Sequence, residues 1–334
     1  MTAVAAALVP GDGIGPEVTD AMVEILRAAG ADIEWHALPG GEASFRDSGD
    51  AMPEATVKTV HELGLALKGP LEVPLRTYEN PNKGLRQAIA AYANVRTVQG
   101  YPLPGRPWHD GMRLAIIREL TEDVARGAAE RTADGQTGIS VKVVTRTASE
   151  KVARFAYGWA TEQGLGSVTV AHLGPSQRET DGLFLDVAME VAGDYPGLVI
   201  TEEAVDPLCV HLIQNPLPYD VVLTMNVYGG IMCGVVAGLA GSVGVMPGVN
   251  VGEHGVVFEA GHGSAPRHAG KDTANPMGVV LSGAMLLDHV GQRDVADRVR
   301  TSIGRVVAEG TAAPRDLGGS GSLRGFVARV GELL

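Results

Sequence analysis

Short apolar runs alternate with amphipathic helical patterns along the chain. Four runs have the length and composition of buried strands: residues 4–10, 114–118, 168–172 and 219–225. Three segments carry apolar residues at helical spacing: 17–29, 151–161 and 275–289. Alternation of this kind is typical of α/β proteins, in which helices cover a largely parallel sheet. We therefore expect an α/β fold.

The charge balance limits the partners of such a fold. Lys and Arg total 27 against 39 Asp and Glu, which gives a net charge of -12. A surface of this sign repels nucleic acid and anionic lipid, so we expect neither as a partner. A small-molecule anion is still a possible ligand, but only where a local cluster of cations binds it.

The N-terminus and the cysteines indicate an ordinary intracellular protein. MTAVAAALVPGDG has a short apolar run without a basic flank, so we interpret it as a first strand and not as a signal peptide. No apolar stretch approaches the roughly 20 residues that span a bilayer. Two cysteines are too few for a disulfide framework. We expect a cytoplasmic protein.

A glycine-rich turn, GDGIGPEV at residues 11–18, follows the first predicted strand. It is not the dinucleotide fingerprint, because its third glycine comes one residue early. The whole string instead resembles the N-terminal motif of the isocitrate/isopropylmalate dehydrogenase family, the β-decarboxylating dehydrogenases. Four further blocks resemble the family in order and spacing: AYANVRTV at 91–98, IRELTEDV at 117–124, TDGLF at 180–184 and FEAGHGSAPRHAGKDTANP at 258–276.

The resemblance implies a two-domain α/β fold that is not a Rossmann fold. Residues 1–99 and 251–334 are expected to form a large domain that carries the cofactor loop. Residues 100–250 are expected to form an inserted small domain with the dimer interface and a clasp at 131–144. Members of the family oxidise a malate-type 2-hydroxy acid with NAD or NADP and then release the β-carboxylate as carbon dioxide.

Three arginines match the family's substrate-carboxylate positions: Arg86, Arg96 and Arg118. The planar guanidinium binds a carboxylate through two parallel hydrogen bonds, which suits this role. Asn82 matches a polar substrate contact. The alternative is that these arginines pair with nearby carboxylates such as Glu119 or Glu122.

The metal positions do not match. The family's divalent ion binds two aspartates of NLFGDILSD and a third from the partner chain. Here the first two positions are Gly230 and Gly234, and only Asp206 matches the third. Because one carboxylate is a poor site for a hard cation, we expect no tightly bound Mg or Mn.

The proton-transfer positions do not match either. The resemblance places Ala125 at the family's tyrosine and Leu173 at its lysine, and neither side chain transfers a proton. The catalytic residues are therefore unknown. His172, next to Leu173, is a candidate because imidazole titrates near neutral pH. The alternative is a hydrogen-bonded structural histidine at a strand end.

The cofactor loop matches more fully. The residues that the resemblance assigns to cofactor binding are His262, Gly263, Ser264, Ala265 and Asn275. Relatives that use NAD place an aspartate where Arg267 stands, followed here by His268. A cation there suits the 2′-phosphate, so we expect NADP in preference to NAD. The alternative is a solvated surface arginine.

Three functions remain open on this basis. The first is a divergent oxidoreductase that binds NAD(P) and an anionic hydroxy-acid-type ligand, with altered, metal-independent chemistry instead of ordinary oxidative decarboxylation. The second is a catalytically silent regulatory or binding subunit. The third is a repurposed non-redox biosynthetic enzyme. We expect a homodimer, or a hetero-oligomer with an ordinary member of the family.

Overall fold

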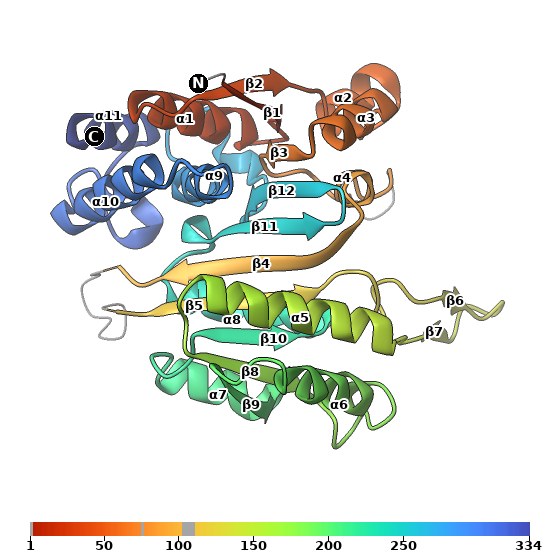
Figure 1. Ribbon diagram of the computed structural model, residues 1–334. Coiled ribbons are helices and arrows are strands. Elements are labelled where there is room, and N and C mark those ends of the chain that lie inside the picture. Colours follow the sequence, from red (N-terminus) through yellow and green to blue (C-terminus); the bar gives the residue numbers. More distant parts are fainter. Residues whose placement is uncertain (1–2, 75–76, 102–110) are drawn as a thin grey trace. The chain divides into compact units, whose positions relative to one another are not determined.

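The computed structural model describes residues 3–74, 77–101 and 111–334, which fold as two units (Figure 1). The first unit comprises Met1–Ala91, Val98–Gly111 and Ala237–Leu334, and the second comprises Tyr92–Thr97 and Met112–Val236. Like the domains expected from the sequence, one unit contains both ends of the chain. Residues 92–97 lie in the second unit, however, and 237–250 lie in the first.

Five strands of the first unit pair in the order β2-β1-β3-β12-β11. Their bounds are Val4–Val9 for β1, Ile33–Ala37 for β2, Leu65–Lys68 for β3, Pro247–Gly252 for β11 and Gly255–Ala260 for β12. β1 is parallel to β2 and β3, β3 is parallel to β12, and only β11 runs antiparallel to its neighbour β12. The segments that follow β1, β3 and β12 therefore leave the sheet at one edge.

Helices of the first unit bury their apolar stripes against this sheet and against one another. Their bounds are Gly15–Ala28 for α1, Glu42–Ser48 for α2, Glu54–Leu63 for α3, Asn82–Ala88 for α4, Met277–His289 for α9, Arg293–Glu309 for α10 and Leu323–Leu333 for α11. α1 begins before the predicted residue 17 because Pro16 fits the first turn of a helix. α9 packs on α1, α10, β11 and β12, and most of its side chains are buried.

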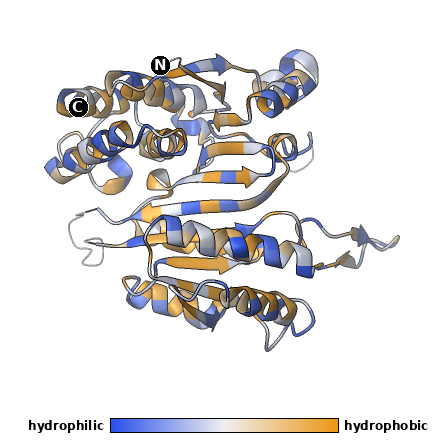
Figure 2. Cartoon of the chain, viewed as in Figure 1, coloured by the Kyte–Doolittle hydropathy of each residue, from blue (hydrophilic) through white to orange (hydrophobic). Residues whose placement is uncertain are grey.

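The second unit contains a mainly parallel sheet in the order β4-β5-β10-β8-β9. The strands are Ala91–Gln99 for β4, Arg113–Glu119 for β5, Ser167–His172 for β8, Val199–Ala204 for β9 and Val221–Thr224 for β10. Of β4, Tyr92–Thr97 belong to the second unit. β10 is buried at every residue, and Figure 2 shows its hydrophobic colouring. A continuous apolar run of this kind is expected for a strand covered on both faces.

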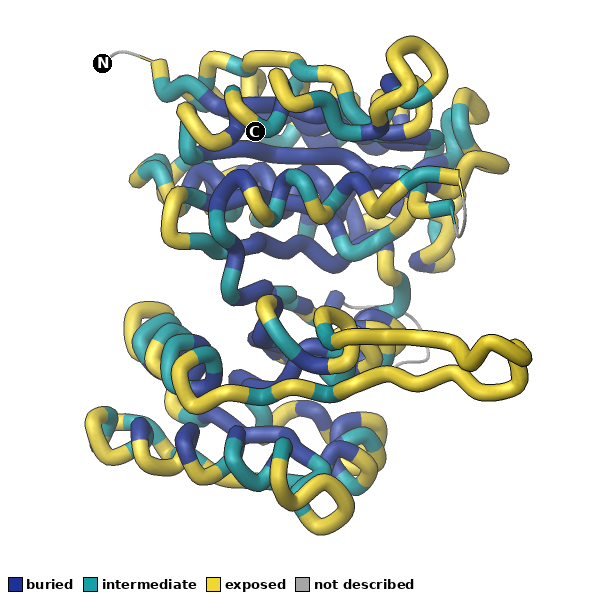
Figure 3. The backbone as a smooth tube through the Cα atoms, turned by 90° about the vertical axis from the view of Figure 1, so that its right-hand side faces the viewer, coloured by how far each residue is buried: buried dark blue, intermediate teal, exposed yellow. Residues whose placement is uncertain are grey.

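Four helices and an exposed arm complete the second unit. The helices are α5 (Arg146–Glu162), α6 (Asp181–Ala192), α7 (Val205–Gln214) and α8 (Asn226–Leu239), whose residues from Ala237 on belong to the first unit. The arm is a hairpin of β6 (Ala129–Arg131) and β7 (Gly138–Ser140), every residue of which is exposed (Figure 3). It overlaps the segment 131–144 that is expected to form the clasp. Among the described residues, no helix combines the length and apolarity that a membrane span requires.

Candidate functional site

The glycine turn after β1 lies against the cofactor loop after β12, within the first unit. The Ile14 N–H donates to the Ser264 carbonyl at 2.8 Å. Gly13 has φ +58°, and a Cβ at this position would lie 2.1 Å from the same carbonyl oxygen. Glycine is therefore required here both for the left-handed conformation and for the close backbone approach.

A buried carboxylate ties the same turn to two further loops. Asp12 accepts hydrogen bonds from the Glu42 and Glu72 N–H groups, each at 2.7 Å. Burial raises the pKa of Asp12, and these two backbone donors oppose the rise. Glu72 in turn accepts a hydrogen bond from the Ser264 hydroxyl. Asp12 and Glu72 thus fix the turn and the cofactor loop at the carboxyl edge of the sheet.

The predicted cofactor residues follow β12 in one loop. His262 is half-buried and its Nδ1 contacts the Gly263 carbonyl at 3.0 Å. Gly263 is open, since no described atom lies within 4 Å of its Cβ position. Ala265 has φ +38°, and the short 3-10 turn that follows, Pro266–His268, carries Arg267 and His268 at the exposed surface. Open backbone at Gly263 is suited to close approach by a ligand, so the loop fits a bound dinucleotide.

Asn275 has a structural role at the start of α9. Its Oδ1 accepts from the Met277 N–H at 2.9 Å, and its Nδ2 donates to Asp316 at 3.1 and 3.2 Å. Asp316 also accepts a hydrogen bond from the Ser242 hydroxyl. Both polar atoms of the Asn275 amide are thus engaged by the protein. Asp316, which the sequence did not point to, sets the orientation of this amide.

The predicted substrate residues divide between the units. Asn82 and Arg86 lie on α4 in the first unit. The Asn82 Nδ2 donates a hydrogen bond to Asn80 Oδ1 at 2.9 Å. Arg96 on β4 and Arg118 on β5 lie in the second unit. Of the three predicted arginines, Arg96 and Arg118 therefore share a unit, and Arg86 lies in the other unit.

Arg118 is positioned by the ends of two parallel strands. It is the register partner of Thr224, the last residue of β10, so the start of α8 lies beside it. Arg118 Nη2 donates to Asn226 Oδ1 at 3.0 Å. The Glu119 carboxylate accepts hydrogen bonds from the Thr121 N–H and hydroxyl and from the Glu122 N–H. The Glu122 carboxylate accepts hydrogen bonds from the Thr145 N–H at 2.7 Å and from the Thr145 hydroxyl at 2.6 Å.

Glycines on α8 receive the Arg118 side chain. A Cβ at Gly229 would lie 2.4 Å from Arg118 Cβ, and a Cβ at Gly230 would lie 3.2 Å from its Nη1. At Gly234, one turn further on, no described atom lies within 4 Å of the Cβ position. The guanidinium therefore lies directly against position 230.

These residues do not fit the divalent cation that the resemblance implies. Positions 230 and 234 provide no oxygen ligand, and a cationic nitrogen of Arg118 faces position 230. Asp206 is exposed in the first turn of α7. Over the described residues, no group of three or more His, Cys, Asp or Glu side chains is arranged to hold a metal ion.

His172 is engaged at both ring nitrogens. Its Nε2 contacts the Glu202 carboxylate, and its Nδ1 accepts the Gly174 N–H at 2.9 Å. The imidazole is buried, with its residue 4% exposed. Taking up a further proton at Nδ1 would break the bond to Gly174. These contacts favour the structural alternative for His172.

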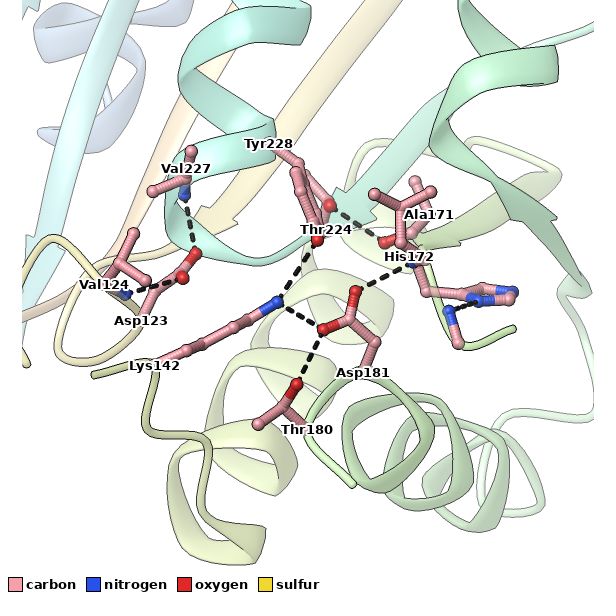
Figure 4. Close-up of polar contacts among 12 residues, drawn as sticks. Asp123, Val124, Lys142, Ala171, His172, Thr180, Asp181, Thr224, Val227 and Tyr228 are labelled. Atoms are coloured by element: carbon pink, nitrogen blue, oxygen red, sulfur yellow. Dashed lines mark hydrogen bonds and ion pairs between the residues drawn. The ribbon is translucent and has the colours of Figure 1, made fainter. Parts of the chain in front are cut away.

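A buried ion pair lies beside position 173 (Figure 4). Lys142 pairs with Asp181, whose second oxygen accepts the Leu173 N–H at 2.9 Å. Lys142 Nζ also donates to Tyr228 Oη at 3.3 Å. Burial alone would lower the pKa of Lys142, but the bond to Asp181 raises it overall, so the lysine stays charged. Burial raises the pKa of Tyr228, and Lys142 opposes this.

Replacing Gly13 by Ala is expected to destabilise the first unit by more than about 2 kcal/mol, because a left-handed conformation alone costs an L-residue about 1–2 kcal/mol. The overlap of Cβ with the Ser264 carbonyl adds to this cost and displaces the cofactor loop. Chemical denaturation gives the change in the free energy of unfolding, and calorimetry gives the change in dinucleotide affinity.

Gly263→Ala is the matched control, because it adds the same methyl group to the same loop in open space. This variant should unfold within about 0.5 kcal/mol of the parent protein. Equal stability of the two variants would show that the Gly13–Ser264 approach does not constrain the loop.

Comparisons with known proteins show which proteins the chain is similar to in sequence and fold. Residues 5–330 match the family described as isocitrate/isopropylmalate dehydrogenase. A Caenorhabditis elegans protein named probable isocitrate dehydrogenase (NAD) subunit alpha, mitochondrial, is 36% identical over 97% of this chain and 90% of its own. The 3-isopropylmalate dehydrogenase of Methanothermobacter thermautotrophicus is 35% identical over 94% and 93%. The crystal structure of isocitrate dehydrogenase from Methylococcus capsulatus superposes with TM-score 0.93 at 34% identity, over 99% of both chains.

The expectation of NADP was wrong. Relatives from Caenorhabditis elegans, Arabidopsis thaliana and Bos taurus are named as NAD isocitrate dehydrogenases, which points to NAD. The expectation depended on Arg267 and His268 alone, and both are exposed on a short turn where a cation is readily solvated. The family match itself covers nearly the whole chain. The chain belongs to the isocitrate/isopropylmalate dehydrogenase family.

Proposed function

We propose that the protein is an NAD-dependent oxidoreductase that acts on an anionic 2-hydroxy acid without a divalent metal ion. NAD, when bound, would accept the hydride from the carbon that carries the hydroxyl group, while the hydroxyl proton would pass to water and the acid would become a 2-keto acid. The observation that carries the proposal is on α8, where Gly230 and Gly234 provide no metal ligand and Arg118 lies against Gly230. A cation and a divalent metal at one position would repel each other strongly.

The cofactor part of the proposal is supported by the loop after β12. Ser264 is held by Glu72 and by the Ile14 N–H, and Gly263 leaves backbone open to a ligand. The relatives named as NAD isocitrate dehydrogenases support NAD as the dinucleotide.

The substrate part is supported by Arg118 and Arg96. Asn226 holds Arg118 by a hydrogen bond at 3.0 Å, which orients the planar guanidinium before a ligand arrives. Preorientation of this kind lowers the entropy lost on binding. A carboxylate is the group that such a fork binds best.

A silent regulatory or binding subunit is the second candidate. Several relatives are named as subunits of NAD isocitrate dehydrogenases. The exposed arm displays Ile139, and the segment that follows it displays Val141 and Val143; these three residues are 43–47% exposed. An apolar strip on an extended hairpin is suited to burial against another chain, which supports a dimer or hetero-oligomer.

Equilibrium titration with NAD tests the step that both candidates share. We expect saturable NAD binding, with a dissociation constant in the range of about 1 µM to 1 mM that is common for enzyme ligands. NADP should bind more weakly. Absence of NAD binding to a folded protein would contradict the proposed oxidoreductase.

A further inference from the structure

We propose that a groove between α1 and α11 binds an aliphatic polyamine, whose ammonium groups pair with carboxylates along α1. The groove lies within the first unit and has a volume of about 500 Å³ (Figure 1). This volume is in the range of about 300–1,000 Å³ that is typical of small-molecule sites. The inference goes beyond the proposed function, because none of the residues assigned above to the cofactor or the acid lines this groove.

Two helices and one turn form the walls of the groove. α11 packs on α1, and the apolar part of the lining includes Ala21 on α1 and Leu323 and Val327 on α11. The turn contributes Asp272, which has φ +55°. Its carbonyl accepts from the Leu323 N–H at 3.0 Å, and its carboxylate accepts from the Arg324 N–H at 2.8 Å. The first turn of α11 therefore holds this wall in place before a ligand binds.

The lining of the groove carries an excess of negative charge. Its charged side chains are four carboxylates and one guanidinium, which gives a formal charge of −3: Glu17, Asp20, Glu24, Asp272 and Arg324. Asp20 follows Glu17 by three positions and precedes Glu24 by four, so these three carboxylates lie on one face of α1. Like charges at this spacing destabilise a helix. A cationic ligand on this face would remove the repulsion.

Glu17 is the carboxylate of the groove that most needs a partner. Its Oε1 atom is buried and accepts no hydrogen bond from the part of the chain that the structure describes. Burial raises the pKa of Glu17, the Gly270 N–H opposes the rise, and the charge of Asp272 adds to it. Removing a carboxylate from water without a cation beside it is costly. An ammonium group next to Glu17 would offset this cost.

The spacing of the carboxylates and the apolar wall together define the class of ligand. A helix rises about 1.5 Å per residue, so Glu17 and Glu24 are about 10 Å apart along the axis of α1. An aliphatic triamine has a comparable length, with ammonium groups at intervals along a methylene chain. Its methylene groups would contact Ala21, Leu323 and Val327. A metal ion lacks these methylene groups, and a monoamine pairs with only one carboxylate.

The test is calorimetric titration with three probes: spermidine, n-butylamine and magnesium chloride. The buffer contains about 0.15 M salt, which screens the general attraction of cations to a protein of net charge -12. We expect spermidine to bind at one saturable site, at least fivefold more tightly than either of the other two probes. The monoamine measures the contribution of the additional ammonium groups, and magnesium measures that of the methylene chain.

Three variants of the lining locate the site. Asp20→Asn and Glu24→Gln should each weaken spermidine binding at least threefold, because each removes one negative charge and keeps the shape of the side chain. Arg324→Ala should strengthen binding, because it removes a competing cation from the lining. Asp47→Asn is the matched control, since Asp47 is exposed on α2 and does not line the groove. This variant should bind spermidine as the parent protein does. Thermal unfolding checks that every variant is folded.

Three results would overturn the inference. The first is that spermidine shows no saturable binding to the folded parent protein. The second is that Asp47→Asn weakens binding as much as Asp20→Asn does, which would mean that spermidine responds only to the net charge of the protein. The third is that magnesium binds as tightly as spermidine, which would mean that the apolar wall does not contribute.

Discussion

Isocitrate and isopropylmalate are expected to be oxidised at least about 10⁵-fold more slowly than by an enzyme with the full set of groups that the resemblance implies. A metal ion that polarises the developing carbonyl contributes several kcal/mol of transition-state stabilisation. Positioned acid and base groups contribute about 10²–10⁴-fold each. Gly230, Gly234, Ala125 and Leu173 stand at the corresponding positions of this chain and provide none of these groups.

The assay follows the absorbance of reduced cofactor with micromolar protein, NAD, magnesium and each acid in turn. A family member with both metal aspartates, assayed under the same conditions, serves as the control. Arginines that bind only the ground state do not restore the rate, because catalysis requires stronger binding of the transition state. Turnover near about 1 s⁻¹, which is common among enzymes, would contradict the assignment of these four positions.

Replacement of Asp181 by Ala is expected to lower the free energy of unfolding by about 3–5 kcal/mol, the usual cost of breaking a buried ion pair on one side. The Asp181 side chain is fully buried, and the Lys142 side chain is 13% exposed. The substitution leaves the Lys142 ammonium without its carboxylate and the Leu173 N–H without its acceptor. Chemical denaturation of both proteins measures the difference.

Replacement of Asp194 by Ala provides the comparison for this prediction. Asp194 pairs with Arg154 at 2.8 Å, but its side chain is 63% exposed. Exposed pairs contribute at most about 1 kcal/mol, so this variant should differ little from the parent. A similar loss for Asp181→Ala and Asp194→Ala would mean that burial does not strengthen the Lys142–Asp181 pair.

Most of the fold was predictable from local patterns. The apolar runs at 114–118 and 168–172 correspond to β5 and β8, and the helical pattern at 275–289 corresponds to α9. These elements are confirmed. Burial of a strand on both faces leaves a continuous apolar run in the sequence, and burial of one stripe of a helix leaves a periodic pattern. The sheet order is not local information, since β12 pairs with β3 although about 190 residues separate them. The family resemblance implied only that the two ends of the chain share a domain.

The candidate site was less predictable, because contacts between distant residues decide it. Asn275 was assigned to the cofactor, yet its amide is engaged by Met277 and by Asp316, which lies 41 residues further along the chain. Lys142 gave no signal, since its partner Asp181 is 39 residues away. The charge of Arg267 suggested NADP, because the sign of a side chain can be read from the sequence and its exposure cannot.

Reduction of NAD by a panel of 2-hydroxy acids, with and without a chelator, tests the proposed oxidoreductase most directly. The account predicts that at least one 2-hydroxy acid reduces NAD and that the rate is unchanged when divalent ions are removed by the chelator. The Arg118→Ala variant should lose this activity, since Arg118, which Asn226 holds in place, is the residue proposed to bind the acid. Activity that appears only with magnesium, or no reduction of NAD by any acid of the panel, would contradict the account.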